Sequence, residues 1–312
     1  MRLNTLLGTK YSIIQGAMAN ISTGEFAANV SNAGGLGIIA SGGMDGPHFR
    51  EQIQSAKAHT NKPFGVNIML MNPCADDLAQ IAIEEQVAVI TTGAGNPSKY
   101  MTSWKEAGIL VFPVVASVAL AKRMEKLGAD GVIAEGTESG GHVGELTTMA
   151  LLPQVINAVS IPVVAAGGIA SGPQMAAVLT LGACGVQVGT CLLVSEECPI
   201  HDNYKLEIIK AKDTSTIVTG RSVGVPVRVL KNPMSREYVK LEHTVEDKME
   251  LEKLTLGSLR KAVVEGDVQG GSFMAGQVAG QLTQIHTLAD ILEDLESSCK
   301  ESLSNMRSYY ED

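Results

Sequence analysis

Residues 162–190 read PVVAAGGIASGPQMAAVLTLGACGVQVGT, and this stretch contains the repeating unit that predicts the fold. It opens with an apolar run, Pro162–Ala166, passes through two glycines, and closes with a second apolar run, Gly185–Val188. The surrounding segment from Leu146 to Ser195 has no charged residue, so both runs suit strands that are buried on both faces. Two such strands separated by a segment long enough for a helix indicate a parallel βαβ unit.

The same unit recurs along the first 190 residues. Short apolar runs, most of them bounded by glycine or proline, occur at Ser12–Ile14, Gly37–Ala40, Gly65–Leu70, Val87–Thr92, Ile109–Val115, Gly131–Ala134, Pro162–Ala166 and Gly185–Val188. Helical spacing follows several of them, as at Thr23–Asn32, Ala75–Glu85 and Val118–Leu127. Eight successive parallel strands close a barrel, so we predict an α/β fold of the TIM (β/α)8 type. An open doubly wound sheet is the alternative, but no G-x-G-x-x-G fingerprint follows the first run.

The composition changes after about residue 200 and divides the chain into two predicted parts. Residues 1–200 form the barrel core with its ligand site. Between Lys205 and Lys240 there are eight basic and three acidic residues, in a chain whose formal net charge is −9. Beyond Leu241 the chain is acidic and helical in pattern, with a glycine-rich interruption at Gly266–Gly280. We therefore expect residues 201–312 to form a basic segment and a helical extension that returns to cap the barrel mouth.

Composition also argues against several classes of protein. Hydrophobic residues make up 45% of the chain and charged residues 18%, which allows a large core and excludes general disorder. An acidic balance and only 4% aromatic residues argue against nucleic-acid binding. The five cysteines form no CxxC pair, so we expect no metal site of the zinc type and no disulfide framework. Prolines and glycines interrupt the charge-free segment and no apolar leader opens the chain, so we expect a cytoplasmic protein without a membrane span.

The ligand site of such a barrel lies in the loops that follow the strands. Small residues dominate those loops and let main-chain N–H groups approach a ligand closely. The candidate positions are Gly16, Ala17, Met18, Asn67, Gly93, Glu135, Gly140, Gly141, Gly167, Gly168, Gln187, Gly189 and Thr190. Gly167-Gly168 and Gly189-Thr190 follow the last two strands, where a ring of amides can receive a phosphate without any lysine. For a single glycine pair, a tight turn without a ligand is the alternative.

Two carboxamides and one histidine add chemistry to these loops. Asn67 and Gln187 end otherwise apolar strands, and each can donate and accept hydrogen bonds to a planar heterocycle such as a flavin. The alternative is that each satisfies a neighbouring main-chain group. His142 is framed by glycines in Gly140-Gly141-His142-Val143-Gly144, a loop with little side-chain cover that suits an acid or base. Glu135 has three alternative roles: it orients that histidine, binds a cation or is structural. Cys191 is predicted to lie at the start of a buried helix.

Several longer motifs resemble one enzyme family. They are Ile14-Gln15-Gly16-Ala17-Met18, Ala33-Gly34-Gly35-Leu36-Gly37, residues 62–70 (KPFGVNIML), 92–100 (TGAGNPSKY), 140–142 (GGH), 165–169 (AAGGI), 186–190 (VQVGT) and 270–277 (GGSFMAGQ). Together they resemble the FMN-dependent enoyl-acyl-carrier-protein reductase II family, within the nitronate monooxygenase superfamily. The blocks at 93–100 and 270–277 are more particular to the reductase branch. Ala17 and Asn20-Ile21-Ser22 depart from the family pattern and leave the acyl chain length open.

The resemblance implies a bound FMN and a reductase activity. The FMN phosphate would lie on Gly167, Gly168, Gly189 and Thr190, and its ring near Ala17, Met18, Asn67, Gln187 and Met274. His142 matches the active-site histidine of the family. NADH or NADPH would deliver hydride to the flavin for a trans-2-enoyl thioester on an acyl carrier protein, an acidic partner that the basic segment can attract. A homodimer and activation by a monovalent cation are further expectations from the family.

Three other activities compete with this interpretation. Nitronate monooxygenase uses the same fold, flavin and histidine, with oxygen as the oxidant. A non-redox barrel that binds a sugar phosphate would share the glycine turns, but no lysine stands at a strand end for a Schiff base. A flavin carrier without catalysis would leave the role of His142 unexplained.

Overall fold

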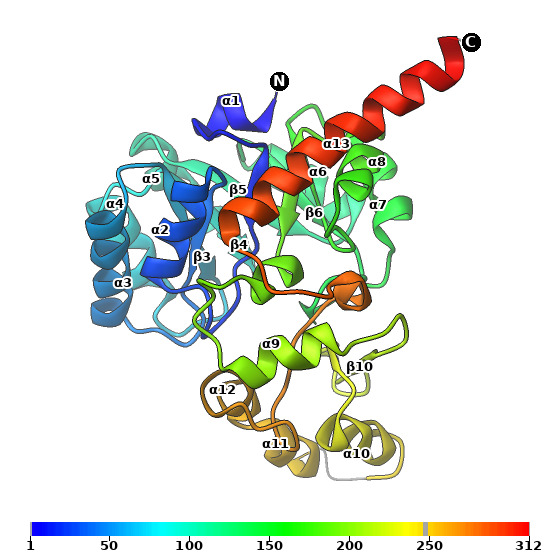
Figure 1. Cartoon of the computed structure of the whole chain (residues 1–312). Helices are drawn as coiled ribbons and strands as arrows, with labels where there is room; N and C mark the ends of the chain where they lie inside the picture. Colours follow the sequence, from blue (N-terminus) through cyan, green and yellow to red (C-terminus); the bar gives the residue numbers. More distant parts are fainter. Residues whose placement is uncertain (1, 246–248, 312) are drawn as a thin grey trace.

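The computed structural model describes residues 2–245 and 249–311, and its core is a closed barrel of eight parallel strands (Figure 1). The order in the sheet is β1-β9-β8-β6-β5-β4-β3-β2. The strands span β1 (Ile13–Gln15), β2 (Gly37–Ala40), β3 (Phe64–Met69), β4 (Val89–Gly93), β5 (Leu110–Val115), β6 (Val132–Glu135), β8 (Val163–Ala166) and β9 (Gly185–Val188). Leu36, at the start of β2, bridges to Ile14 and closes the ring. The predicted TIM barrel is confirmed, with every strand end within two residues of its expected position.

Helices cover the outside of the barrel between successive strands. They are α2 (Gly24–Ala33), α3 (Gly46–His59), α4 (Ala75–Glu84), α5 (Met101–Glu106), α6 (Val118–Lys126), α7 (Thr148–Ile156) and α8 (Gly172–Thr180). Several begin at capping side chains, since Thr23, Asp45 and Ser117 accept hydrogen bonds from amides in the first turns of α2, α3 and α6. The three helical segments predicted from their spacing are α2, α4 and α6, and their bounds agree within one residue.

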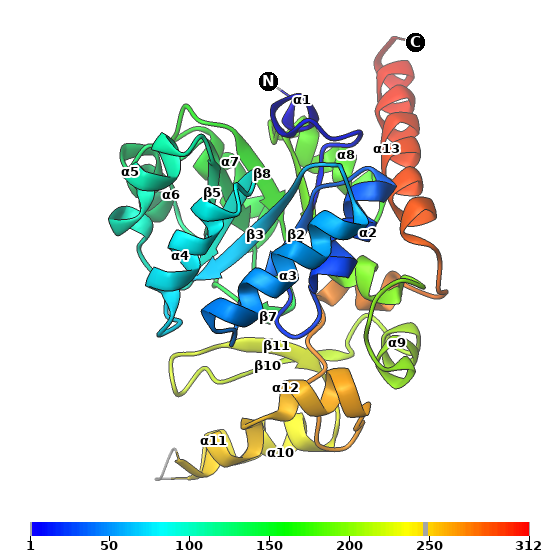
Figure 2. The same ribbon diagram turned by 90° about the vertical axis from the view of Figure 1, so that its left-hand side faces the viewer.

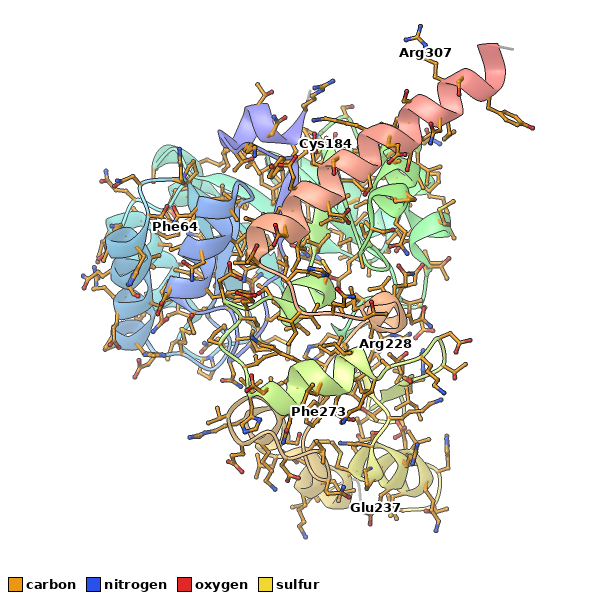
Figure 3. The ribbon with its side chains drawn as sticks, viewed as in Figure 1. Phe64, Cys184, Arg228, Glu237, Phe273 and Arg307 are labelled. Atoms are coloured by element: carbon orange, nitrogen blue, oxygen red, sulfur yellow. The ribbon has the colours of Figure 1, made fainter. Side chains whose placement is uncertain are left out.

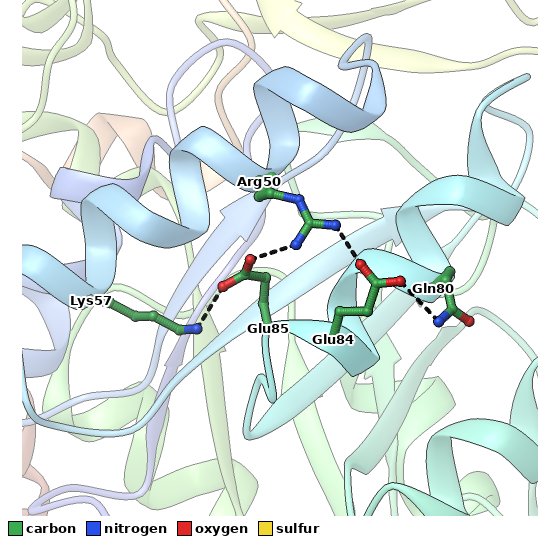
Figure 4. A network of polar contacts seen from close by, with 5 residues as sticks. All are labelled: Arg50, Lys57, Gln80, Glu84 and Glu85. Atoms are coloured by element: carbon green, nitrogen blue, oxygen red, sulfur yellow. Dashed lines mark hydrogen bonds and ion pairs between the residues drawn. The ribbon is translucent and has the colours of Figure 1, made fainter.

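A network of charged side chains joins α3 to α4 on the outer surface (Figure 4). Arg50 of α3 forms ion pairs with Glu84 and Glu85, and Lys57 also reaches Glu85 at 2.7 Å. Such exposed pairs contribute little singly, at most about 1 kcal/mol each, but Glu85 is more buried and shared by two cations. The network therefore holds two neighbouring helices in register at the side of the barrel.

The interior of the barrel is filled from its amino-terminal end. The short helix α1 (Leu3–Leu7) places Leu3 and Leu7 in the same buried cluster as Ile38, Phe112 and Val164. Its first amide donates to Cys184 O at 3.1 Å, which ties the helix to the start of β9. Because leucines close this end, the carboxyl ends of the strands are the side at which the barrel interior opens to the large cavity described below.

The chain after β9 forms a second layer across that open end (Figure 2). Its elements are η2 (Thr190–Val194), α9 (Asp202–Ile209), β10 (Thr216–Thr219), β11 (Val227–Leu230), α10 (Pro233–Glu242), α11 (Met249–Thr255), α12 (Ser258–Arg260), η3 (Lys261–Glu265) and η4 (Gln277–Gln281). The hairpin of β10 and β11 was not predicted, and it pairs with β7 (Gly141–His142) from the barrel loop after β6. The layer and the barrel thus share one antiparallel sheet.

The last helix, α13 (Leu288–Glu311), leaves the mouth and runs up the barrel wall beside α8 and α2 (Figure 1). Leu288, Leu292, Leu295 and Cys299 bury one face of this helix. The cap over the mouth is therefore made by the segment that ends near residue 281, whereas α13 covers the side. In the described part of the chain, none of the helices combines the length and the apolar character that a membrane crossing requires.

Candidate active site

One cavity of about 640 Å³ opens at the carboxyl ends of the barrel strands, within the range of roughly 300–1,000 Å³ that is usual for cofactor sites. Every candidate residue named from the sequence lines it. These residues are Gly16, Ala17, Met18, Asn67, Gly93, Glu135, Gly140, Gly141, His142, Gly167, Gly168, Gln187, Gly189, Thr190 and Met274. The folded chain thus brings together positions that are spread over more than 250 residues of sequence.

The alternation of side chains along each strand explains which residues face the cavity. Ile133 belongs to the cluster inside the barrel, so Glu135, two residues later on β6, points the same way at the mouth. Val164 and Ala166 follow the same rule on β8. The apolar residues lie deep in the barrel, and the polar ones stand one step further along the strands.

The turns after β8 and β9 form an anion-binding corner. Gly167 and Gly168 have φ angles of 88° and 75°, and a Cβ atom on Gly167 would lie 2.6 Å from Gly136 O. Within the described residues, the amides of Gly168, Gly189 and Thr190 donate no hydrogen bond to the protein. No lysine or arginine is found among the described residues that line the cavity. Unpaired main-chain N–H groups at such turns can bind a phosphate group without help from a lysine or arginine.

The two carboxamides of the cavity are available for a ligand. Asn67 donates from Nδ2 to Thr91 Oγ1 at 2.9 Å, which fixes the side chain and leaves its carbonyl oxygen free. Gln187 is 8% exposed, and its amide makes no hydrogen bond within the described chain. The expectation that either amide serves only a main-chain neighbour is not met. A planar ligand with both donor and acceptor edges, as in a flavin ring, fits this pair and the phosphate corner together.

His142 stands at the rim of the cavity on β7. Gly141 and His142 pair with Arg228 and Val227 of β11, so the main chain is a short strand and not the free loop expected from the glycines. The side chain is exposed toward the cavity, and the atoms around the mouth desolvate it enough to lower its pKa from the ordinary value of 6.5. At neutral pH the imidazole is therefore mainly uncharged.

Arg228 of β11, which pairs with Gly141 of β7, is a group that the sequence analysis did not predict (labelled in Figure 3). It is only 6% exposed, and its Nε and Nη2 donate to Thr137 O at 3.1 and 2.9 Å. Its Nη1 donates to Thr216 Oγ1 at 3.1 Å, so one side chain ties β10, β11 and the loop after β6 together. Burial lowers the pKa of this guanidinium, and Glu138 is the acidic group that opposes the shift. The hydrogen bonds to the Thr137 carbonyl hold the segment that carries His142.

Glu135 is a half-buried carboxyl that lines the cavity. Burial raises its pKa to about 7, and the hydroxyl of Ser139 opposes that shift. Ser139 Oγ is buried and has no partner with good hydrogen-bond geometry among the described residues. A carboxyl that is half protonated at neutral pH can give or take a proton at the floor of the cavity.

Glu138 is a site residue that the sequence analysis missed. Its carboxylate accepts from the amide of Thr148, at 2.9 and 3.0 Å, and so caps the first turn of α7. Its main-chain oxygen accepts from the amide of Gln277 at 2.9 Å. The Glu-x-x-Gly spacing before His142 gave no signal for this role, because the partners lie 10 and 139 residues away in sequence.

The segment around Met274 closes the mouth from above. Gly276 donates to Thr190 Oγ1 at 2.9 Å, and the hydroxyl of the buried Tyr204 donates to Met274 O at 2.8 Å. A Cβ atom on Gly140 would lie 2.7 Å from the main chain of Ala275, so only glycine allows this close approach. These contacts hold the segment around Met274 against the loops that follow β6 and β9.

Other expectations from the sequence are resolved by burial. Cys191 is buried in η2, and burial raises the pKa of its thiol to about 12, as expected for a structural cysteine. The basic segment is less basic at the surface than its sequence indicates. Lys205 is buried and donates to main-chain oxygens, as Arg228 does, and Arg221 pairs with Glu145. Within the described chain, no group of three or more potential metal ligands is found.

A closed barrel with a phosphate corner, free carboxamides and a histidine at its rim defines a class of cofactor-binding barrel proteins. Within that class the chain belongs to the nitronate monooxygenase family, whose model matches residues 1–298 and whose members are flavin-dependent oxidoreductases.

Individual relatives cover nearly the whole chain. The structure of FabK from Thermotoga maritima is 49% identical over 98% of each chain, with a TM-score of 0.96. A (3aS,4S,5R,7aS)-5-hydroxy-7a-methyl-1-oxo-octahydro-1H-indene-4-carboxyl-CoA dehydrogenase from Rhodococcus jostii (strain RHA1) is 32% identical over 94% of each chain. A probable nitronate monooxygenase from Staphylococcus saprophyticus is 31% identical over 97% of this chain and 98% of its own length.

Proposed function

We propose that the protein is an FMN-dependent enoyl-acyl-carrier-protein reductase that uses NADH or NADPH. The observation that carries this proposal is the full-length similarity to FabK, an enoyl-acyl-carrier-protein reductase II, at 49% identity. The relative from Rhodococcus is named for a carboxyl-CoA substrate, so a thioester is a substrate class in the family.

The residues of the cavity supply positioning and proton control. When bound, FMN would supply hydride transfer from the nicotinamide to the β-carbon of the enoyl thioester. The free amides after β8 and β9 would hold its phosphate, and Asn67 Oδ1 and the Gln187 amide would orient its ring. The proton that completes the α-carbon would come from a water that the neutral imidazole of His142 orients, or from the minor protonated form of His142. Met274 and its loop exclude solvent from above.

An anaerobic assay tests this function directly. Purified protein is mixed with NADH or NADPH and crotonyl-CoA, and the nicotinamide absorbance is followed. We expect a yellow protein whose nucleotide oxidation depends on the thioester. We expect His142→Ala to lower kcat by about 100-fold, within the roughly 10²–10⁴-fold range of general acid–base groups, and to retain the flavin.

His286→Ala is the matched control, because His286 is exposed and does not line the cavity. It should keep the wild-type rate. A colourless protein would contradict both the FMN proposal and the reductase, whereas a flavin-containing protein inactive with either nucleotide would contradict the reductase alone.

Nitronate monooxygenase is the second candidate, favoured by the names of the family and of the Staphylococcus relative. In that reaction the neutral His142, whose pKa is lowered, would remove a proton from an acidic C–H. Oxygen uptake with propyl-2-nitronate, without nicotinamide consumption, would assign the protein to this branch.

The remaining features are proposals of the same kind. We expect a cytoplasmic homodimer with an acyl carrier protein as partner and a rate that potassium ions increase. Light scattering of the purified protein and assays with and without potassium chloride measure the first and last of these.

A further inference from the structure

Six apolar residues of the cavity lining belong neither to the phosphate corner nor to the groups assigned to the flavin ring. In the closed ring of strands, β3 and β4 stand across from β8 and β9. Residues at the ends of β3 and β4 therefore face the phosphate corner across the width of the mouth, and those at the end of β5 come next to them in the ring. If the anionic end of a ligand binds at the glycine turns, this side of the cavity is left for an uncharged part of the ligand or for a second ligand.

Six apolar residues line this part of the cavity beside the polar Asn67. They are Met69, Ala94, Val114 and Ala116 at the ends of β3, β4 and β5, Leu120 of α6 and Val143 after β7, called here together the β3–β5 wall. The described ionisable groups of the cavity are Glu135, Glu138 and His142, and all three come from the segment between the start of β6 and the end of β7. A nucleotide or a pantetheine phosphate gains nothing from a wall without charge, whereas a hydrocarbon chain is stabilised by it.

The β3–β5 wall borders empty volume, and it is closed at one side and open to solvent at the other. A Cβ atom on Gly93 would meet no atom within 4 Å, so the volume beside the end of β4 is empty of protein. At Gly144 a Cβ atom would lie 2.8 Å from Cβ of Ala116, which marks the closed side. Leu120, in the first turn of α6, is 42% exposed and marks the open end toward solvent.

The wall is continuous with the reacting centre. Val143 follows His142 directly in the chain and is 7% exposed at the inner end of the wall. A substrate whose double bond lies beside His142 would extend its hydrocarbon tail from Val143 toward Leu120. We propose that the β3–β5 wall binds the acyl chain of the thioester substrate and sets the preference for its length; this inference rests on the proposed reductase function.

Chain-length profiles of the holoenzyme test the wall. Trans-2-enoyl-CoA substrates of 4, 6, 8 and 10 carbons are compared by kcat/KM. For the wild type we expect a rise of roughly two- to fourfold per added methylene until the wall is covered. In Leu120→Gln the ratio of kcat/KM for the ten-carbon substrate to kcat/KM for the four-carbon substrate should fall at least fivefold from the wild-type ratio. Leu120→Met, which keeps the apolar surface, should restore the wild-type profile.

Leu303→Gln is the matched control. Leu303 is 38% exposed on α13, close to the exposure of Leu120, and does not line the cavity. Its profile should equal that of the wild type.

A binding measurement avoids dependence on turnover. Calorimetric titration with butanoyl-, octanoyl- and decanoyl-CoA, which carry no double bond to reduce, should give a more negative heat-capacity change with each longer chain. Leu120→Gln should flatten this trend. Reduction of all enoyl chains at equal rates in both wild type and Leu120→Gln would overturn the acyl wall and leave the reductase intact. Failure to reduce any enoyl thioester would instead overturn the proposed function.

Discussion

At the scale of the residue, Glu135 shows how position on a strand changes ordinary chemistry. The sequence placed this carboxyl at the end of an apolar strand, and period-two alternation turns it into the barrel. Burial then raises its pKa to about 7 from the ordinary 4.5. The folded chain holds this proton up to about pH 7, whereas the unfolded chain releases it near 4.5.

Glu135 should therefore make stability depend on pH. The free energy of unfolding that its proton contributes is fully present below about pH 4.5 and is lost as pH rises through 7. Between pH 5 and 8 we expect the wild type to lose roughly 1–3 kcal/mol relative to Glu135→Gln, which has no proton to release. Urea unfolding at both pH values measures this difference. Parallel pH trends in the two proteins would contradict the assignment.

At the scale of the element, the hairpin of β10 and β11 decides where His142 stands. The two-residue strand β7 has too few bonds of its own, and its register comes from Val227 and Arg228. The Arg228 guanidinium adds the bonds to Thr137 O. A segment framed by glycines obtains its order from this partner strand and not from its own sequence.

Arg228→Met should therefore disturb the His142 segment. The substitution leaves Thr137 O without its buried donors, so we expect the free energy of unfolding to fall by about 1–3 kcal/mol. We also expect kcat to fall about tenfold with little change in flavin content, and the pH profile to shift, because the imidazole loses its fixed position. Arg228→Lys should recover part of the rate. Arg236→Met, at an exposed position on α10, is the control and should behave as the wild type.

At the scale of the whole molecule, α13 fastens the end of the chain to the barrel. Gly172 begins α8 at the crossing point, where a Cβ atom would lie inside van der Waals contact of Ser298 and Cys299. The helix packs by the close approach of two main chains, and a buried face of leucines continues the contact.

Gly172→Ala should loosen this crossing. Overpacking against the main chain of α13 is expected to lower the free energy of unfolding by roughly 1–3 kcal/mol, despite the better helix propensity of alanine. Gly46→Ala is matched, because Gly46 also begins a helix, and its Cβ atom would meet the flexible end of Ile81 at 3.1 Å and Asp77 Cβ at an ordinary 3.8 Å. The midpoint of thermal unfolding is measured for both variants, and we expect a lower midpoint for Gly172→Ala. Equal midpoints would show that the crossing tolerates a methyl group.

The sequence by itself determined the barrel and the contents of its mouth. Eight apolar runs at regular spacing dictate parallel strands, and in such a fold the strand ends meet at one face, so residues 16 to 190 could be assigned to one site. Only the tertiary structure revealed the β10–β11 hairpin, the burial of Lys205 and Arg228, and the hydrogen bonds that Glu138 accepts from Thr148 and Gln277. Each of these depends on pairing or burial between segments far apart in the chain, and local propensity and periodicity carry no information about such contacts.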